Sequence, residues 1–165
     1  MGDVAAEYLK TVKARFAEAK KTADRAMAQM TDEQLFWAPG AESNSIAVIV
    51  KHMAGNMLSR WTDFFTTDGE KADRNRDGEF EADAATREAL LARWEQGWQV
   101  FFGALESIGE EDLLRTITIR QEPHSVIQAI ERQMYHYSYH VGQIVYLAKQ
   151  MVDADWQTLT IPRKR

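Results

Sequence analysis

With 165 residues, the chain has the length of one domain, and we expect 1–165 to form a single domain that needs no disulfide to hold its core. It has no cysteine, which excludes thiolate metal sites and cysteine nucleophiles. A net charge of −5 with both signs interspersed argues against nucleic acid as a partner, and no apolar run approaches the roughly 18 residues of a membrane helix. The N-terminal residues do not resemble a signal peptide, so we expect a cytoplasmic protein.

The first half of the chain is predicted to form two long helices. Apolar residues at three- and four-residue spacing predict an amphipathic helix over 4–30. Thr31 and Gln34 have the spacing of a capping box, which predicts a short helical turn ahead of Pro39. The second long helix is predicted to begin near 43–45 and to carry apolar residues through 65, with His52 about two turns from its start.

Residues 66–83 form the one long connection, and they are rich in charge. About 17 extended residues span about 50 Å, more than the roughly 30 Å length of a 20-residue helix, so the segment can act as a crossover. Long connections in compact domains are often functional, and we expect 74–77 to be able to guard a cavity mouth. A third helix is predicted over about 84–106.

The last third of the chain is predicted to contain a minor two-stranded ribbon and a fourth helix. The period-two pattern of 116–119 is repeated at 158–161, and these two segments are expected to pair. Pro123 suits the first position of a helix that runs to about 151. Four long helices with one long connection predict an all-α four-helix bundle in which the second and third helices run parallel.

His136 and His140 carry the strongest chemical signal in the sequence. Residues four apart lie on the same helical face, so the two imidazoles can bind one metal ion. His52 is the expected third ligand, because it lies mid-helix among apolar residues and, with its helix antiparallel to the fourth, near the level of His140. His124 is a poor candidate, since it lies about 18 Å before His136 along the predicted helix. The alternative is that the histidines are ordinary core residues with backbone or tyrosine partners.

Three polar residues share the helical stripes of these histidines and are candidates to orient them or to contact substrate. Gln133 and Gln143 lie on the stripe of His136 and His140, and Asn56 lies one turn from His52. Three neutral imidazoles leave a coordination position open, which is typical of catalytic metal sites. We expect zinc or nickel, with iron as an alternative. The chain lacks the motifs His-Glu-x-x-His and Glu-x-x-His, which disfavours a zincin or a di-iron carboxylate protein, and no catalytic acid or base can be assigned.

The segments that carry these residues resemble the DinB-like (DinB/YfiT-like) metalloenzyme superfamily, in particular a subgroup of uncharacterised bacterial members. The similarity covers nearly the whole chain and rests on 44–47, 50–56, 74–77 and 132–144. The resemblance implies an up-down-down-up four-helix bundle with a divalent metal on His52, His136 and His140. It also implies homodimers and, in some branches, transfer to low-molecular-weight thiols.

We therefore expect a metal-dependent enzyme that acts on a small molecule, with transfer of a low-molecular-weight thiol to an electrophile as the leading hypothesis. Two alternatives stay open: a metal-dependent hydrolase, and a non-catalytic dimeric binding or structural protein whose metal joins two helices. A surplus of large apolar residues on the first and third predicted helices adds to the expectation of a homodimer.

Overall fold

The computed structural model describes residues 4–81 and 85–162, and this part of the chain is mostly helical. Its five α-helices are α1 (Val4–Met27), α2 (Asp32–Phe36), α3 (Ile46–Trp61), α4 (Arg87–Glu106) and α5 (Val126–Val152). Strands β1 (Thr116–Ile119) and β2 (Glu122–Ser125) form a small antiparallel sheet. Three short 3-10 turns are found at Asp77–Phe80, Glu110–Asp112 and Asp153–Asp155.

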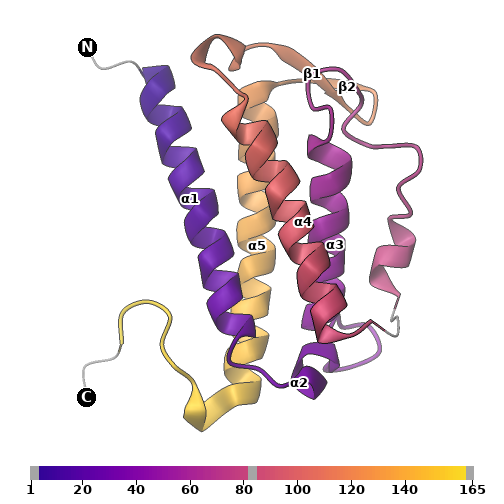
Figure 1. Ribbon diagram of the computed structural model, residues 1–165, viewed down its shortest axis with the longest axis vertical. Coiled ribbons are helices and arrows are strands. Elements are labelled where there is room, and N and C mark those ends of the chain that lie inside the picture. Colours follow the sequence, from indigo (N-terminus) through magenta and orange to yellow (C-terminus); the bar gives the residue numbers. More distant parts are fainter. Residues whose placement is uncertain (1–3, 82–84, 163–165) are drawn as a thin grey trace.

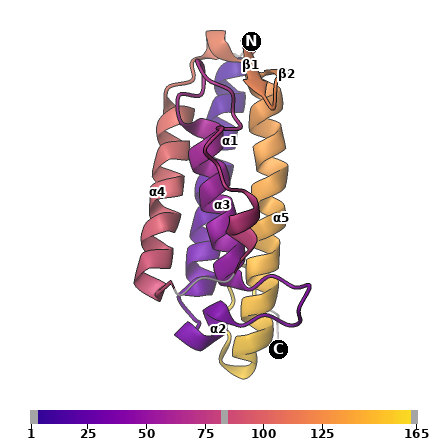
Figure 2. The same cartoon turned by 90° about the vertical axis from the view of Figure 1, so that its right-hand side faces the viewer.

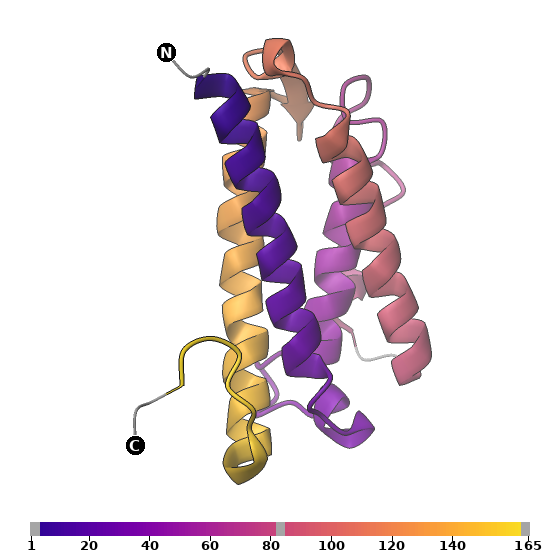
Figure 3. The ribbon, with the colours of Figure 1, turned by 60° about the vertical axis from the view of Figure 1, so that its left-hand side comes forward.

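Figure 1 shows the four long helices α1, α3, α4 and α5 lying side by side, with α2 at one end and the β-sheet at the other. The chain descends along α1 and α5 and ascends along α3 and α4. Figures 2 and 3 show the same layers from two other sides. Helix α3 packs against both α4 and α5, and α1 packs against the other faces of α5 and α4. Helices α3 and α5 therefore run in opposite directions against each other, which is the pairing that brings His52 to α5.

Aromatic side chains fill the space between the helices. The ring of Phe101 in α4 lies 4.5 Å from that of Phe16 in α1, 4.8 Å from Trp61 in α3 and 5.4 Å from Tyr137 in α5. All four residues are at most 2% exposed. Because one residue from each long helix meets here, these aromatic contacts fix the relative positions of α3 and α5.

Helices α3 and α4 approach closely at a glycine. A Cβ atom added to Gly97 would lie 3.0 Å from the Cα of Ala54, closer than side chains ordinarily pack. The large apolar residues of α4 face inward at this contact, and Trp94, Trp98 and Leu105 are almost fully buried within the single chain. The number of large apolar residues on α4 is therefore no reason to expect a partner subunit. The homodimer stays a prediction that rests on the family resemblance.

Serine caps set the starts of the two helices that carry the histidines. Ser45 Oγ accepts a hydrogen bond from the Val48 N–H, and α3 begins at Ile46 as expected from the sequence. Ser125 caps α5 in a reciprocal pair with Gln128, so α5 begins at Val126. The prediction that Pro123 is the first residue of this helix was wrong, because a capping box is a stronger start signal than a proline three residues earlier.

The predicted pairing of 116–119 with 158–161 was also wrong. Strand β1 pairs with β2, so Thr118 lies opposite Pro123 and Ile117 opposite His124. The two-residue turn of Arg120 and Gln121 has positive φ at both positions, as a tight hairpin needs, and closing so short a loop costs little chain entropy. The C-terminal segment instead contacts α1, where Arg25 donates a hydrogen bond to the Leu159 carbonyl at 2.8 Å.

The other helix ends differ from the sequence predictions by a few residues. Helix α1 ends at Met27, and α3 ends at Trp61 because the chain turns at Asp63, which has a positive φ. Thr86 caps α4, so α4 begins at Arg87, and the predicted start at 84 lies outside the described residues. Within the described ranges, no helix has the length and apolar character needed to cross a membrane.

Candidate metal centre

The three histidines expected from the sequence lie together between α3 and α5. His136 Nε2 is 3.2 Å from His52 Nε2 and 3.1 Å from His140 Nε2, and the three ligand atoms all lie within 4.8 Å of one another. Imidazole nitrogens bound to one tetrahedral zinc ion at 2.0–2.1 Å lie about 3.3–3.4 Å apart. The three side chains could therefore hold a divalent ion with little movement. His124 lies in β2, not on α5; it is half-buried and is not part of this cluster.

Hydrogen bonds on the outer ring nitrogens fix how two of the imidazoles face the centre. His52 Nδ1 lies 2.9 Å from Glu79 Oε2, and His140 Nδ1 lies 2.7 Å from Gln143 Oε1. Both partners accept hydrogen bonds, so both Nδ1 atoms carry the proton and both Nε2 atoms present lone pairs. Only His136 Nε2 can then donate, and it can serve one neighbour at a time. The three facing nitrogens thus have at most one proton among them. Their remaining lone pairs are available to bind a metal ion.

Glu79 orients His52 and belongs to the long connection between α3 and α4. Its carboxylate also accepts two hydrogen bonds from Arg74, from Nε and Nη2, each at 2.8 Å. Burial alone would raise the pKa of Glu79, but the hydrogen bonds from His52 and Arg74 and the Arg74 charge hold it below its usual value. Glu79 is therefore an anion that fixes the orientation of the His52 ring, as carboxylates behind metal-bound histidines do.

Gly55 makes room for this carboxylate on the surface of α3. A Cβ atom at position 55 would lie 2.2 Å from Glu79 Oε1 and 2.7 Å from Glu79 Cδ. The carboxylate could move away only by giving up its hydrogen bonds to His52 and Arg74. A glycine three residues after the histidine is thus part of how the chain positions that histidine.

The polar residues predicted beside the histidines occupy two different places. Gln143 contacts His140 directly. Asn56 and Gln133 contact each other instead: Gln133 Nε2 donates to Asn56 Oδ1 at 2.8 Å, and the Tyr137 hydroxyl donates to the same oxygen at 3.2 Å. These buried hydrogen bonds join α3 to α5 beside the histidines, so they hold the two ligand-bearing helices in register.

The imidazoles of α5 are held in the neutral state. Burial, strengthened by the nearby His140 and His52, lowers the pKa of His136 to about 3. Burial also lowers the pKa of His140, although the hydrogen bond to Gln143 opposes the shift. Neutral imidazoles are the protonation state that binds metal ions, so the protein environment favours a metal-binding form at neutral pH.

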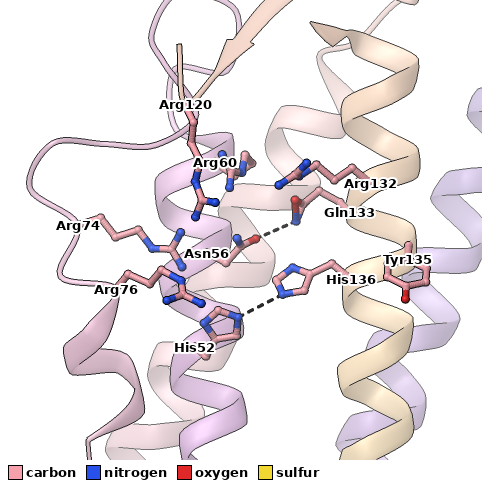
Figure 4. Close-up of a pocket in the computed structure, with 10 residues that line it drawn as sticks. All are labelled: His52, Asn56, Arg60, Arg74, Arg76, Arg120, Arg132, Gln133, Tyr135 and His136. Atoms are coloured by element: carbon pink, nitrogen blue, oxygen red, sulfur yellow. Dashed lines mark hydrogen bonds between the residues drawn. The ribbon is translucent and has the colours of Figure 1, made fainter. Parts of the chain in front are cut away.

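A cavity of about 350 Å³ opens beside the histidines, as Figure 4 shows. His52 and His136 form part of its wall, together with Asn56 and Gln133. The rest of the lining is basic: five arginines reach it from α3, from the long connection, from the hairpin turn and from α5, namely Arg60, Arg74, Arg76, Arg120 and Arg132. The cavity gives a small molecule direct access to the histidine cluster.

Several of these residues could not be assigned from the sequence. Glu79 is 27 positions from His52 and lies in a segment that has many other carboxylates, so no spacing rule identifies it. Arg60 had a usable signal, because it falls two turns after His52 on an otherwise apolar helix, close to the stripe of Asn56. Arg120 is placed by the hairpin, whose pairing the period-two pattern of the sequence does not reveal.

Comparison with known protein families gives a match over nearly the whole chain. Residues 3–165 match the family described as "Protein of unknown function (DUF1572)". The chain belongs to this family. No curated protein matches the sequence.

The contact between Gly55 and Glu79 makes a mutational prediction. Gly55→Ala should displace the Glu79 carboxylate and lower the affinity for zinc by about 10- to 100-fold, the usual effect of losing the partner of a metal-bound histidine. Isothermal titration calorimetry with a competing chelator would measure this.

Gly103→Ala in α4 is the matched control, because nothing lies within 4 Å of a Cβ atom at that position. It should leave zinc affinity unchanged and raise the free energy of unfolding by about 0.5–1 kcal/mol, as glycine replacement in a helix interior does. Equal zinc affinities of Gly55→Ala and the unmodified protein would contradict the role given to Glu79.

The lowered pKa of His136 predicts a pH dependence for the metal-free protein. The unfolded chain takes up the His136 proton near pH 6.5, whereas the folded chain does so only near pH 3. The unfolded state therefore binds more protons in this window, and the free energy of unfolding should fall by about 1–2 kcal/mol between pH 7 and pH 5. Urea denaturation at each pH would show this decline, which His136→Asn should reduce and His124→Ala should not. A decline of the same size in His136→Asn would assign it to other groups.

Proposed function

We propose that this protein is a metal-dependent enzyme that binds a divalent ion through His52, His136 and His140 and transfers a low-molecular-weight thiol to electrophilic small molecules. The observation that carries the proposal is the convergence of three Nε2 atoms beside an open cavity, with those of His52 and His140 lying 3.2 and 3.1 Å from that of His136. A site that only stabilised the fold would be expected to be closed by a fourth protein ligand.

The donor set suits zinc, nickel or ferrous iron, all of which accept imidazole nitrogen. A bound divalent ion would supply Lewis acidity, which lowers the pKa of a thiol that reaches it from the cavity. Glu79 and Gln143 would hold His52 and His140 in the correct tautomer, and Asn56 and Gln133 would keep α3 and α5 at a fixed separation. The thiol loses its proton to solvent, its sulfur bonds to the electrophilic carbon, and the leaving group departs with the bonding electrons.

Membership of the DinB-like superfamily is part of this proposal. The DinB-like superfamily is characterised by an up-down-down-up four-helix bundle, and the directions of α1, α3, α4 and α5 in Figure 1 support that arrangement here. The long connection between α3 and α4 supports it too, since two parallel neighbouring helices need a crossover. The thiol itself comes from the resemblance, not from the cavity.

Metal content and thiol turnover test the proposal together. Protein purified without a histidine tag should contain about one divalent ion per chain, measured by elemental analysis. His136→Ala should lose the ion and should reduce metal-dependent consumption of a low-molecular-weight thiol with a model electrophile at least 100-fold, because the central nitrogen of the set is gone. His124→Ala, which alters the half-buried histidine of β2 outside the cluster, should change neither quantity.

Two results would overturn the proposal in different ways. If the protein held no metal after zinc loading, the three histidines would not form a metal site. Stoichiometric metal with no turnover of any thiol, but with cleavage of an ester or amide in thiol-free buffer, would replace thiol transfer by metal-dependent hydrolysis, which uses the same three ligands.

A further inference from the structure

The cavity beside the histidines has a charge imbalance. Five guanidinium groups line it, from Arg60, Arg74, Arg76, Arg120 and Arg132. Within the described residues, only two carboxylates contact these groups from inside the site, Glu70 and Glu79; the Asp77 carboxylate near Arg76 is 96% exposed. Positive charge is thus concentrated in one cavity on a protein whose net charge is −5.

The two inner carboxylates are also shared. Glu70 contacts three guanidiniums: Arg60 at 3.4 Å, Arg74 at 3.1 Å and Arg120 at 3.1 Å. Glu79 serves Arg74 and the imidazole of His52. One negative charge cannot neutralise three, so the arginines repel one another across the cavity unless another anion joins them.

Arg60 shows the imbalance most clearly. Its side chain is 3% exposed, yet its Nε and Nη1 atoms are buried with no hydrogen-bond partner, and its one contact with Glu70 is long. Burial lowers the pKa of the Arg60 guanidinium; Glu70 opposes this, but Arg132, Arg74 and Arg120 add to it. Buried guanidinium N–H groups without protein acceptors are costly, so the described protein groups compensate the Arg60 charge only in part.

The surrounding structure holds these side chains in place. The turn that carries Arg120 has left-handed backbone at Arg120 and Gln121, and Asp68 accepts hydrogen bonds from both backbone N–H groups, at 2.8 and 2.7 Å. These two hydrogen bonds fix the hairpin turn and therefore the backbone from which the Arg120 side chain extends. Arg74 is fixed by its paired hydrogen bonds to Glu79. In Figure 4, Arg132 on α5 points toward Arg60 on α3 from the opposite side of the cavity.

We propose that this arginine cavity is the binding site for a doubly charged oxyanion group, a phosphate or a pair of carboxylates, on a small substrate whose reactive end faces His52 and His136. Guanidinium groups pair with such oxygens in a planar, bidentate manner that lysine cannot reproduce. A volume of about 350 Å³ lies at the low end of ligand sites and fits a small metabolite. This anionic group defines the substrate class of the proposed enzyme. Only the placement of the substrate's reactive end at the histidines rests on the proposed function.

Binding of inorganic phosphate and of succinate tests the anion site. Both would be titrated by calorimetry into zinc-loaded protein and into chelator-treated protein, at constant ionic strength, since phosphate can itself bind zinc. Chelator-treated protein should bind at least one of the two probes, and Arg60→Met should weaken that binding at least tenfold. Arg60→Met should also raise the melting temperature of the probe-free protein, because it removes a buried, unsatisfied charge.

Arg120→Gln and Arg115→Gln form a matched pair. The two arginines are about equally exposed, at 51% and 49%, but Arg115 contacts Asp112 and the ring of Phe65 outside the cavity. Arg120→Gln should weaken probe binding several-fold, and Arg115→Gln should not change it. If Arg60→Met did not fold, Arg120→Gln and Arg132→Gln would decide the question.

The outcomes separate this inference from the proposed function. Tighter binding of phosphate would assign a phosphate group and tighter binding of succinate a dicarboxylate, and either supports the site. Probe binding that depends on Arg60 in a protein that never takes up metal would keep the anion site and overturn the metalloenzyme. Stoichiometric metal with no binding of either probe, or with binding that is equal in Arg60→Met, would overturn the anion site alone.

Discussion

The hydrogen bond between His52 and Glu79 ties the histidine cluster to the long connection between α3 and α4, and most of the site depends on it. It sets the tautomer of His52, so that its Nε2 faces the other two imidazoles. Glu79 in turn holds Arg74, and Arg74 reaches Glu70, which contacts Arg60 and Arg120. A chain of charged contacts therefore runs from the candidate metal ligands along one side of the cavity.

The connection is thus more than a crossover between two parallel helices. It carries acidic groups that orient a ligand and basic groups that line the cavity, and at Gly69 it is attached both to α3 and to the hairpin. Gly69 N–H donates to the Thr118 carbonyl in the hairpin, while Ser59 Oγ on α3 donates to the Gly69 carbonyl. A segment fixed to α3 and to the hairpin in this way can hold charged groups at constant distances from the histidines, which an unattached loop could not do.

The sequence predicted those parts of the site that depend on local rules. His136 and His140 share a face because of helical geometry, and His52 stands out as their partner because an imidazole among the apolar residues of a helix needs one. The same holds for the capping box of Thr31 and Gln34. Glu79 and the arginine cavity follow from packing between distant segments, which no periodicity reports. The two errors, the helix start at Pro123 and the pairing of 116–119 with 158–161, both came from overlooking the local hairpin.

The arrangement places two complementary features on one cavity: neutral imidazole nitrogens that favour a cation, and guanidiniums that favour an anion. A substrate that carries an oxyanion at one end would be oriented by the arginines before its other end reached the histidines. Fixing a reactant in this way is one of the larger contributions a protein can make to a reaction rate. The same arginines would repel a free cation, so the histidine site depends on Glu79 and Glu70 to offset their charge.

X-ray absorption spectroscopy of the zinc-loaded, untagged protein would show whether His52, His136 and His140 bind one ion and leave a position open to the cavity. We expect scattering from three imidazoles at about 2.0–2.1 Å with one further light atom that is not an imidazole, and from two imidazoles in His140→Ala. A carboxylate ligand that disappears in Glu79→Gln would contradict it, because Glu79 would then bind the metal itself instead of orienting His52.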